Sequence, residues 1–437
     1  MANDHKFHIA IVGGGIVGLT FAIALHKSGA PVDVDIYEAA PAFGEVGAGM
    51  AFLPRMWDAM RVLGLEEQLR PKTGAGKPFR FSKAIEGPLT VFGENEEAMD
   101  SYHRAEVLSL LTSNLPKEYR THFGKRLVAY IDAPGQPVQL HFKDGTTATC
   151  DLLVGSDGIK SSVRGELYEQ LAARVEGDDP ARAQQLREYI PAKWTGIHMF
   201  RGLVPREKLE AACPDHPVFD GPVFMQGKGK YLLTYPISQG TIINCSGIIN
   251  NPEGLGKLHP EPWVVYPTHE EFHEAYAGFS PYVHTVIDLI EKPTKWVANS
   301  VMGLPTFVDG RVALVGDAAH AMTPHLASGA GQGVEDGLVL AALLASPHAR
   351  PDTLPAVLRA YDAVRRPFSQ DILKRSYDAG TMLCLMSERT AGGKTGAADL
   401  AGLNADLNDI TRWAWTTSSQ VERDAALKLL AEYVGEK

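Results

Sequence analysis

Short apolar runs that end in glycine-containing turns recur along the chain. The first run, Ile9–Val12, is rich in β-branched residues and predicts a buried parallel strand. Leu19–Lys27 then has helical character and ends at Gly29, a residue type that favours helix C-termini. The segment 30–38, APVDVDIYE, predicts a second buried strand. A strand, a helix and a strand in this order predict the start of an α/β fold.

The first turn carries the pattern G-x-G-x-x-G, formed by Gly13, Gly15 and Gly18. The first glycine of such a turn permits the tight bend, the second lets backbone approach a pyrophosphate, and the third lets helix and strand pack closely. Glu38 ends the second strand 20 positions after Gly18, where an acceptor for ribose hydroxyls belongs. A plain glycine turn with an ordinary surface glutamate is the alternative. The spacing favours a cradle for FAD or NAD.

Two later segments have the same strand-and-turn form. Leu152–Val154 predicts a buried strand, after which Asp157 lies at the tip of a turn and Ser161 precedes a helix. Alone, the tripeptide SDG that contains Asp157 is usually just a turn. A further strand ends at Val315 and is followed by Gly-Asp, whose acid is Asp317.

The order of these three motifs resembles the single-component flavoprotein aromatic hydroxylases (group A monooxygenases) over most of the chain. The resemblance implies that the first motif holds the ADP half of FAD. It implies that Asp157 contributes to flavin and nicotinamide nucleotide binding, and that Asp317 contacts the ribityl chain and pyrophosphate. The segments 360–370 (AYDAVRRPFSQ) and 412–430 (RWAWTTSSQVERDAALKLL) are most similar to salicylate hydroxylases and their fungal relatives.

Smaller signatures extend this resemblance. Gly49 and Ala51 belong to the segment 45–52 (EVGAGMAF), which is similar to the loop beside the flavin. Arg104 stands at a predicted helix start, where the family uses an arginine against the flavin. Arg55 departs from the family, which usually has Pro-Asn at this point after the glycine-rich loop.

The stretch 315–337, VGDAAHAMTPHLASGAGQGVEDG, has four possible interpretations: a plain strand-to-helix connection, a metal site, a hydrolase site and one half of a nucleotide cradle. A metal site formed by His320 and His325 would need a third ligand, and the chain has no H-E-x-x-H pattern. A hydrolase site would need a nucleophile elbow, which this stretch lacks. A flavin loop fits best, because Asp317 would accept hydrogen bonds from ribityl hydroxyls. We expect His320 to cap or pack inside the loop, while His325 either packs or lines the substrate pocket.

The glycines after this loop suit the reactive end of a flavin. We expect Gly329, Ala330 and Gly331 to present backbone N–H groups to the isoalloxazine carbonyl. A helix beginning near Gly333 would direct its positive end at the same edge of the ring. The family resemblance implies that Pro324 lies by the flavin C4a atom, with its carbonyl toward the peroxide.

Two residues of a predicted sheet are candidates for substrate contacts. Arg201, in HMFRGLV, would direct a cation at a phenolate or carboxylate. Tyr235, in LLTYPIS, would hydrogen-bond the phenol oxygen and assist its deprotonation. The resemblance implies equivalents of both near the ring. The alternatives are a surface arginine on an alternating strand and a half-buried sheet tyrosine.

The predicted fold class is α/β, with a Rossmann-like FAD-binding domain of the para-hydroxybenzoate hydroxylase type, an inserted and mainly antiparallel substrate sheet, and a C-terminal helical segment. We expect the FAD-binding domain to be discontinuous. Its parts are 1–70, 101–175 and 296–380, and the other units are a substrate domain (71–100 and 176–295) and a C-terminal helical segment (381–437). We interpret 166–188, which is charged and rich in alanine, as one solvated helix.

Composition narrows the class of protein. A net charge of −10 disfavours nucleic-acid binding, because no basic field would neutralise phosphates. Cys150, Cys213, Cys245 and Cys384 form no C-x-x-C pair, which suits a reducing compartment. The apolar run 9–25 contains three consecutive glycines and lacks a following cleavage site, so we predict neither secretion nor a membrane span. We expect a cytoplasmic monomer or homodimer.

The resemblance implies an FAD-dependent monooxygenase that consumes NADH or NADPH and O2. It would hydroxylate a phenolic aromatic acid by way of a flavin C4a-hydroperoxide, with a salicylate-like substrate and oxidative decarboxylation as the leading hypothesis. Hydroxylation of another phenol, a phenolic aldehyde or a hydroxy-N-heterocycle without loss of CO2 is the alternative. A flavin reductase and a flavin-binding protein without turnover also remain open.

Overall fold

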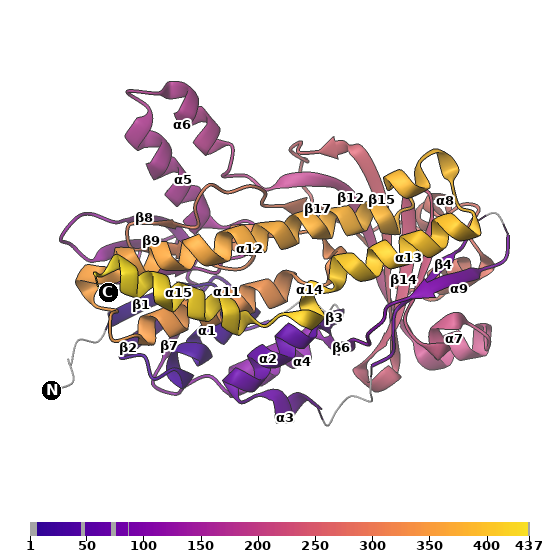
Figure 1. Cartoon of the computed structure of the whole chain (residues 1–437), viewed down its shortest axis with the longest axis horizontal. Helices are drawn as coiled ribbons and strands as arrows, with labels where there is room; N and C mark the ends of the chain where they lie inside the picture. Colours follow the sequence, from indigo (N-terminus) through magenta and orange to yellow (C-terminus); the bar gives the residue numbers. More distant parts are fainter. Residues whose placement is uncertain (1–6, 45–48, 71–75, 86, 436–437) are drawn as a thin grey trace.

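A six-stranded sheet organises the part of the molecule at the left of Figure 1. The computed structural model describes residues 7–44, 49–70, 76–85 and 87–435. Neighbouring strands of this sheet run parallel except at the β18 edge. In spatial order the strands are β18 (Val308–Asp309), β19 (Val312–Leu314), β11 (Leu152–Gly155), β1 (Phe7–Val12), β2 (Val32–Glu38) and β7 (Arg120–Phe123).

Helices α1 (Ile16–Lys27) and α11 (Gly329–Ala345) pack closely together because two glycines lie between them. A Cβ atom at Gly333 would lie 2.5 Å from the Val17 side chain, and one at Gly337 would lie 3.1 Å from Phe21. Both helices begin earlier than the sequence predicts. Glycine has a low helix propensity, so the glycine-rich first turns of these helices do not resemble helix in the sequence.

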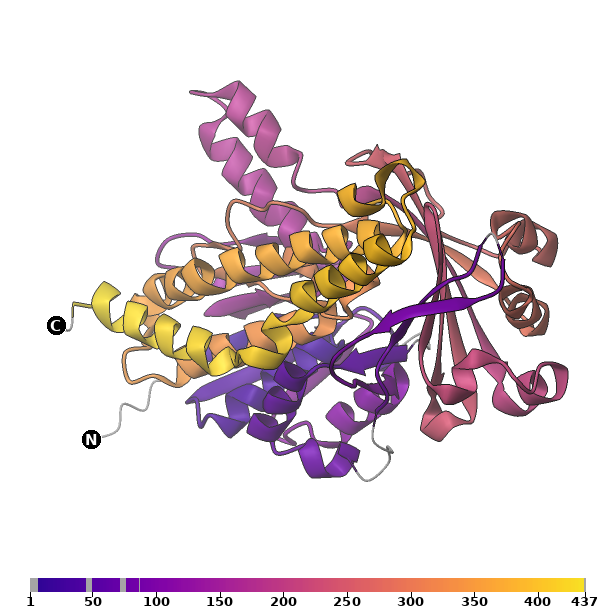
Figure 2. The same ribbon diagram turned by 45° about the vertical axis from the view of Figure 1, so that its right-hand side comes forward.

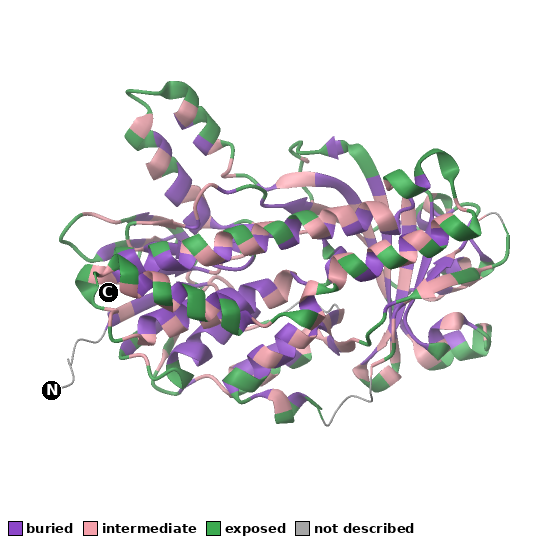
Figure 3. Cartoon of the chain, in the orientation of Figure 1, coloured by how far each residue is buried: buried purple, intermediate pink, exposed green. Residues whose placement is uncertain are grey.

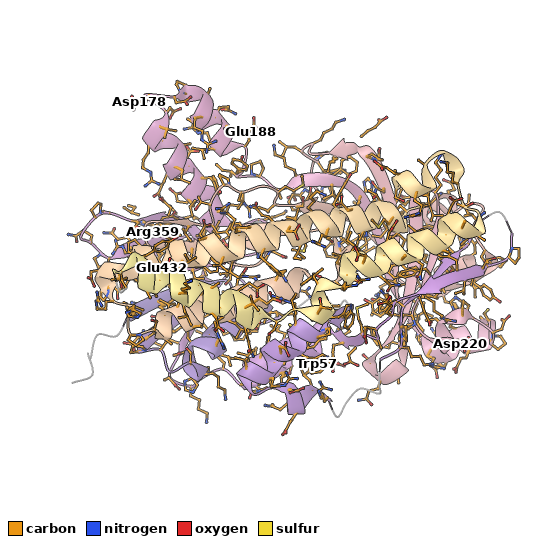
Figure 4. The ribbon with its side chains drawn as sticks, viewed as in Figure 1. Trp57, Asp178, Glu188, Asp220, Arg359 and Glu432 are labelled. Atoms are coloured by element: carbon orange, nitrogen blue, oxygen red, sulfur yellow. The ribbon has the colours of Figure 1, made fainter. Side chains whose placement is uncertain are left out.

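A three-stranded antiparallel sheet joins the same hydrophobic core. It consists of β8 (Leu127–Ile131), β9 (Val138–Phe142) and β10 (Thr147–Cys150). Next to it, α5 (Ser162–Val175) and α6 (Pro180–Arg187) form a helical hairpin that projects from the molecule, with Asp178 at its tip (Figure 4). The prediction of one helix over 166–188 is therefore wrong. Asp179 caps α6 and Pro180 occupies its first turn, so the chain starts a new helix there.

An eight-stranded, mainly antiparallel sheet forms the other part of the molecule (Figures 1 and 2). Two of its strands contain the segments HMFRGLV and LLTYPI, which the sequence predicts to lie in an antiparallel sheet. In spatial order the strands are β16 (Val264–Val265), β17 (Thr294–Ser300), β12 (Lys193–Pro205), β15 (Ile242–Leu255), β14 (Lys230–Ile237), β13 (Val223–Gly227), β4 (Arg80–Lys83) and β5 (Thr90–Glu94). Because β17 pairs with β12, residues 296–300 belong to this sheet rather than to the six-stranded one.

One face of the eight-stranded sheet packs on three helices through a core of its own. These helices are α7 (Arg206–Ala212), α8 (His269–Ala275) and α9 (Pro281–Leu289). The opposite face turns toward the C-terminal helices, where a separate apolar cluster includes residues of strands β4, β13 and β14. Both faces of the sheet are therefore covered, and Figure 3 shows its strands as largely buried.

The last part of the chain runs along both sheets (Figure 1). It consists of α12 (Leu354–Leu383), α13 (Ala397–Thr411), α14 (Trp413–Thr416) and α15 (Ser419–Tyr433). Arg359 of α12 and Glu432 of α15 lie beside each other in Figure 4, where these two helices pack together. The Arg359 guanidinium also lies 5.4 Å from the Tyr433 ring.

Several short elements connect the two sheets. They are β3 (Gly49–Phe52), α2 (Pro54–Leu63), α3 (Glu66–Leu69), β6 (Asp100–His103), α4 (Arg104–Ser113), α10 (Asp317–His320) and the 3-10 helix η4 (Pro324–Leu326). The arrangement confirms the predicted fold class. Within the described residues, no helix combines the length and apolar character that crossing a membrane requires. The four cysteines are free thiols, and all but Cys213 are buried.

Candidate active site

The three sequence motifs meet at one edge of the six-stranded sheet. Strands β19, β11 and β1 are parallel neighbours, so their carboxyl ends lie side by side. Gly13 follows β1, Asp157 follows β11 and Asp317 follows β19. The connections from β1 and β11 leave in different directions at this edge, and such a switch point is where open α/β sheets bind their ligands.

The space around each glycine of the first turn fits the role that the pattern predicts for it. Gly13 has a φ of +112°, and a Cβ atom there would lie 2.3 Å from the Ser156 carbonyl oxygen. A Cβ atom at Gly18 would lie 2.1 Å from the Gly13 carbonyl oxygen. At Gly15, the N-cap of α1, a Cβ atom would meet nothing within 4 Å. The turn is thus tight where backbones touch and open where a pyrophosphate would approach, which fits a dinucleotide.

Glu38 lies against this turn from the end of β2. One of its carboxylate oxygens accepts a hydrogen bond of 2.7 Å from the Gly14 N–H, and the other accepts one of 2.7 Å from the Ala40 N–H. These bonds hold the carboxylate beside the glycine turn, where the sequence predicts an acceptor for ribose hydroxyls.

The partly buried Asp157 side chain lies against the start of α5. Its carboxylate accepts hydrogen bonds from the Ser161 hydroxyl at 2.5 Å and from the Ser162 and Val163 N–H groups at 2.7 and 3.2 Å. Burial raises the pKa of this carboxyl, although the three donors oppose the shift. Its described contacts are therefore with a helix N-terminus, and a direct contact with nucleotide stays a prediction.

Arg164 is a contributor that the sequence did not single out. It is 1% exposed and donates from one guanidinium nitrogen to the Ala318 carbonyl at 2.9 Å and from others to the Ile159 and Ile190 carbonyls. Burial lowers its pKa to about 10. Because Arg164 belongs to α5 and Ala318 follows Asp317, this side chain ties the second motif to the third. No local pattern distinguishes such an arginine from a surface one.

Beyond Asp317, the first turn of α11 presents unpaired backbone donors. Ser328 is the N-cap, and the Gln332 N–H is the first to donate to it, at 2.9 Å. The N–H groups of Gly329, Ala330 and Gly331 therefore have no acceptor within the helix. A Cβ atom at Gly331 would meet nothing within 4 Å. This positive helix end suits the anionic edge of a reduced flavin.

A cavity of about 680 Å³ lies between the two sheets and includes the mouth of this loop. Its volume is in the usual range for a cofactor and substrate site. Ten of the predicted site residues line it: Gly49, Ala51, Arg104, Arg201, Tyr235, Asp317, Pro324, His325, Gly329 and Ala330. The others, Gly13, Gly15, Gly18, Glu38, Asp157 and Gly331, lie outside its lining, and residues 45–48 of the predicted flavin loop are outside the described residues.

Arg201 and Tyr235 lie on the floor of this cavity, on β12 and β14. Burial lowers the pKa of Arg201, and the Arg104 cation adds to that effect while Tyr235 opposes it. Burial raises the pKa of Tyr235 to about 12, although Arg201 opposes the shift. Among the described residues no carboxylate pairs with the Arg201 guanidinium, which lies 5.5 Å from the Trp296 ring. The cavity therefore offers an anion a cation and a hydroxyl donor.

Gly49 explains how closely β3 approaches this floor. A Cβ atom at Gly49 would lie 2.3 Å from the Tyr235 hydroxyl oxygen. Any larger residue would displace Tyr235, so glycine at this position allows β3 to contact the eight-stranded sheet at the cavity.

His325 enters the cavity from η4. Its Nδ1 lies 2.8 Å from the Tyr231 hydroxyl, and its Nε2 has no hydrogen-bond partner among the described residues. Burial lowers the pKa of His325 to about 3, so the imidazole is neutral at pH 7. Of the two interpretations that the sequence left open, the structure favours lining the pocket.

His320 is placed differently, inside the loop. Its Nε2 lies 2.5 Å from Asp336 Oδ2, which also accepts a hydrogen bond of 2.9 Å from the Gly316 N–H. The prediction that His320 packs inside the loop agrees with this geometry. Among the described residues, no group of three or more His, Cys, Asp or Glu side chains is arranged to hold a metal ion.

Arg55, which departs from the family pattern, points away from the cavity into a buried ion-pair network. Its guanidinium donates to both carboxylate oxygens of Glu335 at 2.8 Å, to Glu422 at 3.1 Å and to the Thr417 hydroxyl at 2.7 Å. Arg365 pairs with Glu335 from the other side, at 3.1 Å. The pKa of Arg55 is raised overall, because its ion pairs with Glu335 and Glu422 outweigh the lowering effect of burial.

This network holds a C-terminal segment that closes the cavity. Glu422 and Thr417 flank the turn between α14 and α15. The preceding residues form part of the cavity wall: Leu407, Ile410, Thr411, Trp413, Ala414 and Trp415. The segment therefore helps to exclude water from the space between the sheets.

Comparison with known proteins supports the interpretation of this geometry. Residues 6–185 and 279–376 match the protein family described as FAD binding domain. A salicylate hydroxylase of Pseudomonas putida is 34% identical over 440 residues, which cover 97% of this chain and 95% of that protein. The 6-methylsalicylate 1-monooxygenase atA of Aspergillus terreus is 32% identical over 450 residues, covering 99% of this chain and 94% of that protein.

Among solved structures, one described as a salicylate hydroxylase substrate complex superposes with a TM-score of 0.80 and 31% identity. The superposition covers 97% of this chain and 98% of that one. The similarity therefore includes both sheets and the C-terminal helices that enclose the cavity.

Proposed function

This chain belongs to the FAD binding domain family and is an FAD-dependent aromatic monooxygenase, and from that premise we propose that it hydroxylates a salicylate-type phenolic acid with NADH or NADPH as reductant. The observation that carries the proposal is the Arg201 guanidinium on the cavity floor, which has no carboxylate partner among the described residues. A partly buried cation without an anion in the protein fits an anionic substrate.

The proposed reaction converts a salicylate anion, O2, NAD(P)H and two protons into a catechol, CO2, NAD(P)+ and water. A carbon–oxygen bond forms at the ring carbon that bears the carboxylate. The bond from that carbon to the carboxylate breaks, and its electron pair returns to the ring. FAD, when bound, supplies the electron transfer and oxygen activation.

The chain's own residues orient the substrate. Arg201 would hold the carboxylate or phenolate. Tyr235, with its pKa raised to about 12, stays protonated and would donate to the same anion. The imidazole of His325 stays neutral at pH 7 and its Nε2 is buried against Gly380 of α12, so His325 shapes the pocket wall rather than taking the phenol proton.

Trp413, Trp415 and their neighbours in the C-terminal wall would exclude water from the cavity. The cavity-facing first turn of α11 would bind the anionic edge of the reduced cofactor. Within this proposal Asp317 serves the ribityl chain, and Arg104 lies against the flavin.

The test is oxidation of NADH and of NADPH by the FAD-loaded protein against hydroxybenzoates and phenols, with catechol and CO2 both quantified. Salicylate-stimulated oxidation with equal amounts of catechol and CO2 supports the proposal. Hydroxylated product from another phenol without CO2 keeps the monooxygenase and rejects the decarboxylation. Oxidation without incorporation of 18O from 18O2 into any product rejects oxygen transfer.

Replacement of Arg201 sharpens this test. Arg201→Ala is expected to retain FAD and lose about 100-fold or more in kcat/KM for salicylate, comparable to removing one donor from an oxyanion site. Arg206→Ala is the matched control, because Arg206 follows the same strand and its side chain pairs at the surface with Glu210. Equal kinetics for the two variants would remove Arg201 from the site.

A further inference from the structure

The cavity floor changes from polar to apolar across the eight-stranded sheet. Five cavity-lining residues lie directly opposite one another on successive strands: Arg201 on β12, Ser246 on β15, Leu233 on β14, Phe224 on β13 and Phe81 on β4. The row begins with a cation and a hydroxyl and ends with an aliphatic and two aromatic side chains. Strands in a sheet are about 4.8 Å apart, so the two ends of the row are roughly 19 Å apart.

The neighbouring row follows a similar course. Trp296, Met199, Ile248 and Tyr231 pair in register on β17, β12, β15 and β14, and all four line the cavity. The Tyr231 hydroxyl, which faces the apolar end of the floor, is already engaged by His325 Nδ1 at 2.8 Å. This row therefore adds apolar surface and no further charge.

The apolar end also has an apolar roof. Leu383 of α12 and Leu407 of α13 line the cavity and belong to the same buried cluster as Phe81 and Phe224. Helix α13 packs beside β5, at the edge of the sheet farthest from β12 in this row (Figures 1 and 2). The predicted flavin contacts Arg104, Asp317 and Gly329 come from the other sheet and its connections, so this end is not part of the cofactor cradle.

We propose that the substrate is a salicylate-type acid that carries an apolar substituent of several carbons on the side of the ring opposite its carboxylate. The proposal rests on the proposed function for the reacting end, where Arg201 holds the anion. The rest of the molecule would then extend along the row toward Phe224 and Phe81. An unsubstituted salicylate would leave this apolar surface without a partner, and burying each additional methylene there improves binding by about fourfold.

A series of 4-alkyl salicylates tests the proposal, because position 4 is opposite the carboxylate. The FAD-loaded protein is titrated with the unsubstituted, methyl, propyl and pentyl compounds, and binding is followed by the change in the flavin absorption spectrum. Binding is expected to tighten by about threefold to fourfold per methylene along the series. A chain of equal length that ends in a carboxylate is expected to lose this gain, because no cationic side chain lines that end within the part of the chain that the structure describes.

Turnover and binding separate the two proposals. If salicylate is hydroxylated but affinity does not rise with chain length, the apolar-substituent proposal is overturned and the proposed function stands. If affinity rises with chain length but no compound yields a hydroxylated product, the proposed function fails and the apolar end remains supported.

A variant at the roof locates the effect. Leu407→Phe would fill the apolar end and is expected to reduce the preference for pentyl over unsubstituted salicylate by about tenfold. Leu403→Phe is the matched control, because Leu403 lies one turn earlier on α13 in the same buried cluster but outside the cavity lining. The control is expected to keep the wild-type preference. An equal loss in both variants, or in neither, would contradict the placement of the substituent.

Discussion

Burial sets the protonation state of Tyr235 and His325, two residues that line the cavity. Tyr235 stays a donor because burial raises its pKa to about 12, and His325 stays neutral because burial lowers its pKa to about 3. Neither group changes charge near pH 7. The cavity therefore presents a hydroxyl donor and an uncharged imidazole throughout that range.

The depressed pKa of His325 has a consequence for stability. In the unfolded chain a histidine binds a proton as the pH falls below its usual pKa of about 6.5, whereas in the folded chain His325 binds one only near pH 3. The unfolded state therefore gains protons first, and the free energy of unfolding falls as the pH decreases through this window. Stability that is present above pH 6.5 is lost toward pH 3.

We predict that His325→Asn reduces this acid sensitivity by about 2 kcal/mol between pH 6.5 and pH 4.5. Urea unfolding at several pH values measures it, with the wild type and with the exposed His26→Asn as references. Identical pH slopes for the three proteins would show that His325 is not buried as described.

At the scale of elements, α11 is held by charges as well as by apolar packing. Arg55 of α2 and Arg365 of α12 both bind Glu335, and Glu422 of α15 completes the group. These side chains are at most 10% exposed, so water does not compensate a missing partner. The network fixes the helix whose first turn faces the cavity relative to the segment that closes it.

Breaking this network is predicted to be costly. Arg55→Met leaves Glu335 with an uncompensated part of its charge and is expected to lower the free energy of unfolding by about 3–5 kcal/mol. Arg61→Met on the same helix removes exposed pairs with Asp58 and Glu66 and is expected to cost far less, because water screens those pairs. Thermal and urea unfolding compare the two variants. Similar losses would mean that the buried network contributes no more than a surface pair.

Prediction from the sequence succeeded for elements whose signals are local. The turn at Gly13 and the helix start at Arg104 follow from short contiguous patterns, and the structure contains both. The prediction was wrong at the start of α11 and over 166–188. The first turn of α11 is rich in glycine, which has a low helix propensity, so the sequence does not indicate where this helix begins. Within 166–188, Pro180 begins a second helix, α6, where the sequence predicts one continuous helix.

At the scale of the whole molecule, the predicted FAD site joins segments that are distant in the sequence. The turns after β1, β11 and β19 meet at one edge of the six-stranded sheet, and Asp317 in the last of these turns also lines the cavity, whose other walls come from the eight-stranded sheet and the C-terminal helices. A ligand that contacts all of them in the folded state and none of them in the unfolded state stabilises the fold by mass action.

Removal of FAD is therefore predicted to lower Tm, and adding FAD back at about 100 times its Kd should restore about 2.7 kcal/mol. Calorimetry of the flavin-free protein at graded FAD concentrations measures this. FMN is the matched ligand, because it lacks the AMP part of FAD, which belongs to the half that the cradle of Gly13, Gly15 and Gly18 would hold. Equal stabilisation by FMN and FAD would show that the glycine turn contributes nothing to cofactor binding.

The sequence by itself determined the dinucleotide turn, the order of the three motifs and the sheet strands that carry Arg201 and Tyr235. Each of these depends on residues within one short segment, where backbone conformation follows from glycine, β-branched side chains and alternation. Only the tertiary structure decided that Arg55 binds Glu335, 280 positions away, and that the Asp157 carboxylate accepts hydrogen bonds from the start of α5. The polar-to-apolar row from Arg201 to Phe81 likewise depends on strand register, which is set by packing across the whole sheet.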